Sequence, residues 1–200
     1  MRKLLFILMF IPGYLFADCA PYKIDPAVTF SVPQYVENIS IDPALVGATH
    51  GNVVSSFSEK YELQVASLKA PGGFCVVLSK VNAEIGYTEF QINISPDYEA
   101  GSCKYDFILQ HEYMHKYTYL SVMESEKSRV EQALSATVNS IFPIFIEKEA
   151  DVQKALDSFK KQINENPKMR LAIQKIQAEQ EIRNRKVDES PDNKRFLECK

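Results

Sequence analysis

The chain has 200 residues, with 23 Lys and Arg against 26 Asp and Glu, so its formal net charge at pH 7 is −3. Such a length suits one domain with a hydrophobic core, or a small domain with an extension. The acidic balance leaves no basic stripe that could neutralise phosphates, so we expect no nucleic-acid partner.

The first residues have the three parts of a secretory signal peptide. Met1-Arg2-Lys3 is basic, residues 4–10 are apolar, and Leu15-Phe16-Ala17 ends on a small residue that suits cleavage. The apolar run is shorter than the about 20 residues of a bilayer span, so we expect removal of residues 1–17 and no stable transmembrane anchor afterwards. The mature protein, residues 18–200, is then periplasmic or secreted, with 21 basic and 26 acidic residues and a net charge of −5.

The first part of the mature chain, residues 18–100, is predicted to be β-rich. Apolar and polar residues alternate before turn signals such as Pro71-Gly72-Gly73, and Gly86-Tyr87 separates two apolar runs in the manner of a hairpin. We expect a mostly antiparallel sheet of four or five strands. The predicted strands cover residues 28–32, 36–41, 61–65, 74–85 and 89–94, and residues 44–56 are ambiguous between loop and short helix.

The second part, residues 101–186, is predicted to be a long helical hairpin. Neither glycine nor proline occurs between Gly101 and Pro143, and apolar residues recur there at helical spacing, which predicts one long helix. A second helical segment begins near Glu147 and is interrupted at Pro167. Residues 187–200 are predicted to be a turn and tail, so the fold class is α+β in a single domain.

The long helix carries the motif His111-Glu112-Tyr113-Met114-His115 near its start. Residues four apart lie on one face of a helix, so both imidazoles can reach one metal ion. This HExxH pattern is typical of zinc peptidases, in which the histidines bind Zn²⁺ and the glutamate is the general base. We therefore predict that His111 and His115 are metal ligands and that Glu112 is catalytic.

A catalytic zinc site needs a third protein ligand, and the sequence leaves its identity open. Glu126 and Glu131 are roughly 16 and 24 Å from His115 along an unbroken helix of about 1.5 Å rise, too far to bind the same ion. His50 and Asp188 are the other candidates, the latter if the tail folds back. Nearby tyrosines at positions 113, 117 and 119 are candidate hydrogen-bond donors to an oxyanion, with packing as the alternative.

Four cysteines remain after signal cleavage, which predicts two disulfides in an exported protein. No Cys-x-x-Cys spacing supports a cysteine zinc site. Of the three possible pairings we favour the one that joins Cys103, just ahead of the motif, to Cys199 near the end of the chain. This bond would hold the tail beside the metal site.

Residues 74–116 resemble a group of exported bacterial domains that are regarded as zinc-dependent proteases. The resemblance rests on Cys75, the paired strands, Gly101-Ser102-Cys103-Lys104-Tyr105 and the HExxH motif, and these domains are similar to gluzincin-like peptidases. It implies a metallopeptidase fold and a zinc cofactor but no particular substrate. The downstream glutamate motif of gluzincins is not recognisable in this chain.

The expected function is hydrolysis of peptide bonds in protein or peptide substrates by an exported zinc enzyme. Residues 90–94, which lead into the metal helix, are a candidate strand for pairing with an extended substrate, with a core strand as the alternative. Two other functions remain open. One is a non-catalytic envelope module that binds proteins through its helical hairpin, and the other is a metal-dependent amidase that acts on cell-wall peptide.

Overall fold

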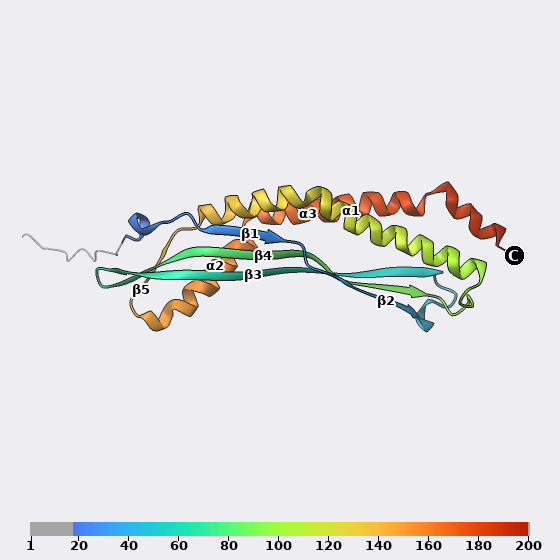
Figure 1. The fold of residues 1–200 in the computed structure, drawn as a ribbon, viewed down its shortest axis with the longest axis horizontal. Coiled ribbons are helices and arrows are strands. Elements are labelled where there is room, and N and C mark those ends of the chain that lie inside the picture. Colours follow the sequence, from blue (N-terminus) through green and yellow to red (C-terminus); the bar gives the residue numbers. More distant parts are fainter. Residues whose placement is uncertain (1–17, 200) are drawn as a thin grey trace, which may run out of the picture.

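A computed structural model describes residues 18–199 as an α+β fold, in which a long, narrow sheet is followed by helices (Figure 1). The predicted signal peptide lies outside these residues. Within them the sheet has five strands: β1 (Ala27–Ser31), β2 (Val36–Ile41), β3 (Gly51–Ala70), β4 (Gly73–Ile94) and β5 (Ile144–Ile146). The α-helices are α1 (Cys103–Ser140), α2 (Val152–Glu165) and α3 (Pro167–Asp188).

Strand β4 is the centre of the sheet along its whole length. On one side it pairs antiparallel with β3, from Ala70 opposite Gly73 to Gly51 opposite Ile94. On the other side β5, β1 and β2 pair with successive parts of β4. Within the described chain β3 pairs with no second strand, so it forms one free edge of the sheet.

The sheet differs from the prediction in two ways. Most of its residue pairs are antiparallel, through β3 and β5, but β1 and β2 run parallel to β4. The hairpin does not turn at Gly86, which lies inside β4; a Cβ at this glycine would be 2.9 Å from Pro33 Cδ, so the glycine permits close approach of the chain between β1 and β2. The hairpin instead turns between β3 and β4, where Gly72 has a φ of 81°.

Residues 90–94 form a core strand, and the alternative of a substrate-binding edge is wrong for them. They pair with β2 on one side and with β3 on the other, so their backbone groups are already used. The side chains of Phe90, Ile92 and Ile94 are fully buried. Within the described residues, the edges open to an added strand belong to β3 on one side and to β5, β1 and β2 on the other.

The prediction of a long first helix is confirmed. Helix α1 has 38 residues and begins after Ser102, whose hydroxyl accepts a hydrogen bond from the Tyr105 amide. The second segment divides at Asn166 into α2 and α3, since proline at the first position of α3 removes a backbone donor. Helix α3 returns beside α1 in the opposite direction, so the predicted pairing of two long helices is present, with β5 and α2 in the connection (Figure 1).

The helices and the sheet share one large hydrophobic core. Buried side chains of α1, α2 and α3 pack with those of β4, among them Val130, Leu134, Phe159, Ile176 and Ile85. A smaller cluster joins Ile108 near the start of α1 to Ile92 and Ile94. This cluster holds the motif-bearing turn of α1 against the far end of the sheet.

Two disulfides connect distant parts of the chain. Cys19 is bonded to Cys75 of β4, and Cys103 is bonded to Cys199 as we predicted. Bonds of this kind are typical of proteins that fold in an oxidising, extracytoplasmic compartment. Among the described helices, none is both long and apolar enough to cross a bilayer.

Candidate metal centre

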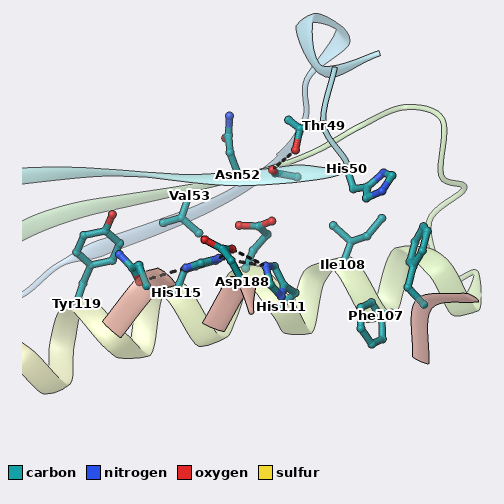
Figure 2. Close-up of a pocket in the computed structure, with 14 residues that line it drawn as sticks. Thr49, His50, Asn52, Val53, Phe107, Ile108, His111, His115, Tyr119 and Asp188 are labelled. Atoms are coloured by element: carbon teal, nitrogen blue, oxygen red, sulfur yellow. Dashed lines mark hydrogen bonds and ion pairs between the residues drawn. The ribbon is translucent and has the colours of Figure 1, made fainter. Parts of the chain in front are cut away.

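The side chains of His111, His115 and Asp188 point toward one another on the surface of α1 (Figure 2). The Nε2 atoms of the two histidines are 3.1 Å apart. The Asp188 Oδ1 atom lies 3.0 Å from Nε2 of His115 and 3.4 Å from Nε2 of His111. Three atoms that can each bind a metal thus form one small triangle.

This triangle has the size that a zinc site requires. Tetrahedral ligands at the usual zinc bond lengths lie roughly 3.3 to 3.6 Å from one another. The three measured separations agree with that range to within a few tenths of an ångström. Two imidazoles and one carboxylate are also among the ligand types that zinc prefers, so the residues present fit this metal.

Antiparallel packing of α1 and α3 brings Asp188 to the histidines. Helix α1 carries the histidines near its beginning, and Asp188 is the last residue of α3. The other candidates for a third ligand are not in this group. His50 lines the same cavity and accepts or donates a hydrogen bond at Nδ1 with the Tyr98 hydroxyl, whereas Glu126 pairs with Arg129 one turn along α1.

A second residue of α3, Asn184, orients one of the imidazoles. Its Oδ1 atom is 3.1 Å from Nδ1 of His115, so with the hydrogen on Nδ1 the opposite nitrogen is left as a lone-pair donor. Partners of this kind fix the tautomer and rotation of a metal-binding histidine. Sequence reasoning missed Asn184, although its spacing of four from Asp188 places both on one face of a helix.

The Glu112 carboxylate lies in the same cavity but is directed to the start of β3. The residue is only 5% exposed. A Cβ at Gly51 would lie 2.8 Å from Glu112 Oε1 and 2.8 Å from Ile108 Cγ2, so glycine is needed there for the strand to approach α1 this closely. Burial, and secondly the charge of Asp188, raise the pKa of the Glu112 carboxyl to about 7.

The three candidate tyrosines have different surroundings. Tyr119 lines the cavity one turn beyond His115 and packs against the rings of Tyr87 and Phe90. Tyr113 donates a hydrogen bond to Glu37 on β2, and Tyr117 is 59% exposed. Of these hydroxyl-bearing residues, only Tyr119 therefore lines the cavity that contains the histidines.

The cavity has a volume of about 550 Å³, within the usual range for ligand sites. Its walls are residues 49–53 around the beginning of β3, the part of α1 from Phe107 to Tyr119, the end of α3 and Phe196 in the C-terminal segment. Figure 2 shows Val53 of β3 above the helix and close to the three convergent side chains. The first residues of β3, whose edge is free, and the candidate metal ligands therefore line the same cavity.

No family model matches the chain, and comparisons with curated proteins and with solved structures found no significant match.

Proposed function

We propose that this protein is an exported zinc-dependent peptidase that works in the periplasm or outside the cell. The observation that supports it best is the convergence of His111, His115 and Asp188, with the motif glutamate in the same cavity. The signal-like first residues, the two disulfides and the resemblance to exported HExxH proteases favour the same function.

In this proposal the two histidines and Asp188 hold the zinc, and Asn184 keeps His115 in the required tautomer. Zinc in such a site supplies a Lewis acid for the scissile carbonyl and lowers the pKa of water toward neutrality. The Glu112 carboxylate accepts the proton of the attacking water and then donates it to the leaving amine. Tyr119 supplies a hydroxyl on the same side of the cavity.

An extended peptide would bind beside β3. The edge of this strand is open within the described chain, and its first residues, Gly51 to Val53, border the cavity. Added strands gain affinity from backbone hydrogen bonds, which do not depend on the side chains of the peptide. A peptide paired with this edge would have its backbone next to the three convergent ligand atoms.

The first experiment is metal analysis of the purified mature protein and of its His115→Ala and Asp188→Ala variants. We expect one zinc per chain in the wild type and a large loss in both variants. A Glu126→Ala variant, changed on the same helix but outside the cavity, is the matched control and should retain zinc. Equal zinc in the wild type and in His115→Ala would refute the metal site.

The second experiment separates catalysis from metal binding. Glu112→Gln keeps the size of the side chain but cannot accept a proton, so it should retain zinc and lose peptidase activity by at least a hundredfold. A zinc-free protein without peptidase activity, whose binding to an envelope partner survives His111→Ala, would instead support the non-catalytic module.

A further inference from the structure

The cavity has two chemically different ends. Toward the start of α1 its lining is mainly aromatic and apolar, with Phe107 and Ile108 from α1, His50 ahead of β3 and Phe196 from the C-terminal segment. Toward the end of α3 its lining includes Asn184 and Tyr119. Beyond them a neighbouring hollow is lined by polar side chains, namely Gln177, Gln180, Glu181 and Arg185. The candidate metal ligands lie between the two ends.

Phe196 is held in place by contacts with three other segments. Its ring stacks on His50 at a centroid distance of 4.7 Å and meets the rings of Tyr98 at 5.8 Å and Phe107 at 5.9 Å. The Lys104 ammonium lies 5.5 Å from the same ring centroid. Three residues later the chain is bonded to the first residue of α1 through the Cys103–Cys199 disulfide.

The His50 ring is itself fixed. Its Nδ1 atom and the Tyr98 hydroxyl are 2.5 Å apart, and the two rings meet edge to face. Phe196 therefore rests on a braced partner, and the aromatic side of the cavity is preformed. We call the residues His50, Phe107, Ile108 and Phe196 the aromatic wall.

We propose that the aromatic wall is a subsite for a large apolar side chain of the substrate, next to the bond that is cleaved. This inference rests on the proposed peptidase function and adds a substrate class to it, namely peptides with Phe, Tyr, Leu or a similar residue at that position. Phe107 and Phe196 are only partly buried, so a substrate side chain can remove apolar surface of the wall from water.

The expected preference follows from the area that a side chain buries. A phenylalanine that enters an apolar subsite gains roughly 10- to 100-fold in binding over alanine at the same position. Truncation of Phe196 removes one side of the subsite and should reduce this preference by about tenfold or more. Sites built from rigid aromatic groups select by size and apolarity, with little demand on polar groups.

The test uses the full mature chain with Glu112→Gln, loaded with zinc, so that binding is measured without cleavage. Two fluorescent peptides that differ only by Phe or Ala at one position are titrated, the position being varied along the peptide. The same measurements are made after an added Phe196→Ala change. Leu197→Ala is the matched control, because Leu197 is in the same segment but is 83% exposed and does not line the cavity.

The proposal predicts tight binding of the Phe peptide at one position, loss of this preference with Phe196→Ala, and no change with Leu197→Ala. Equal affinity for both peptides at every position, or an unchanged preference with both Phe196→Ala and Phe107→Ala, would overturn it. Zinc content of each variant shows that the site itself has survived. Since binding is the readout, expected binding by the Glu112→Gln chain together with no cleavage by the zinc-loaded wild type would contradict the peptidase function and leave the subsite intact.

Discussion

The contact between Glu37 and helix α1 provides a test of what holds the metal-binding turn to the sheet. Tyr113 Oη donates to Glu37 Oε1 at 3.0 Å, and the Lys116 ammonium pairs with Oε2. Both partners belong to the turn that contains His115, and β2 lies across β4 from the cavity. The side chain of Lys116 is 6% exposed and that of Glu37 is 27% exposed.

The loss in the free energy of unfolding on breaking this contact should depend on which partner is replaced. In Glu37→Met a buried ammonium loses its carboxylate, which typically costs about 3–5 kcal/mol. Cation–π contacts of Lys116 with Tyr113 and Tyr117, at 4.6 and 4.8 Å, offset about 1 kcal/mol of this. We therefore expect a loss of about 2–4 kcal/mol in the free energy of unfolding.

In Lys116→Met the remaining Glu37 carboxylate is more exposed and keeps its hydrogen bond from Tyr113, so the loss should be about 1–2 kcal/mol. The double variant leaves no unpaired charge and should lie within about 1 kcal/mol of the wild type. Urea unfolding of the metal-free protein measures all three. Losses below about 0.5 kcal/mol in both single variants would refute the reasoning.

The stabilising effect of the Glu37 carboxylate should depend on pH. The hydrogen bond from Lys116 holds the pKa of the Glu37 carboxyl below its usual 4.5. A lowered pKa stabilises the fold fully above the unfolded-state value and less as the pH falls toward the folded-state value. The advantage of the wild type over Glu37→Met should therefore be constant at neutral pH and shrink below about pH 4.5. An advantage that is unchanged at pH 3 would contradict this.

Three other changes test the surroundings of the metal site. Asn184→Ala should weaken zinc binding about 10- to 100-fold in a competition titration with a chelator, because His115 loses its orienting partner. Gly51→Ala should lower the free energy of unfolding by about 1–3 kcal/mol and reduce peptidase activity with zinc retained, since its Cβ would meet Glu112 and Ile108. Replacement of Cys103 and Cys199 by serine should remove about 4–5 kcal/mol of stability in urea, because the bond spans 96 residues, and should abolish the preference for Phe peptides while zinc stays bound.

Much of the local structure follows from the sequence because it depends on neighbouring residues. The absence of glycine and proline between Gly101 and Pro143, together with the helical spacing of apolar residues there, predicts α1, and the alternation in residues 36–41 predicts β2 with its correct ends. The pairing of β2 with β4 does not follow from the local sequence in this way. Its parallel direction depends on contacts between residues about 50 positions apart, which no local pattern encodes.

The uninterrupted course of β4 through Gly86 also has a nonlocal cause. Glycine before a second apolar run is a common turn signal, and the sequence gives no sign that Pro33 lies against this position. In the site, the two histidines and Glu112 are recognisable from their spacing alone. Asp188 could be named from the sequence only as one of several candidates for the third ligand, and Asn184 is recognisable only once α3 is known to run beside α1.

The position of Asp188 shows that the candidate metal site and the aromatic wall depend on different long-range contacts. Asp188 is the last residue of α3. The buried side chains on that helix fix its position along α1, namely those of Met169, Ala172, Ile173 and Ile176. The disulfide acts only after this point, on the segment that carries Phe196. A fold-back through the disulfide is therefore not needed to bring the carboxylate to the histidines, since helix packing already does so. For this reason loss of the disulfide should impair the selection of side chains and leave the three ligand atoms together.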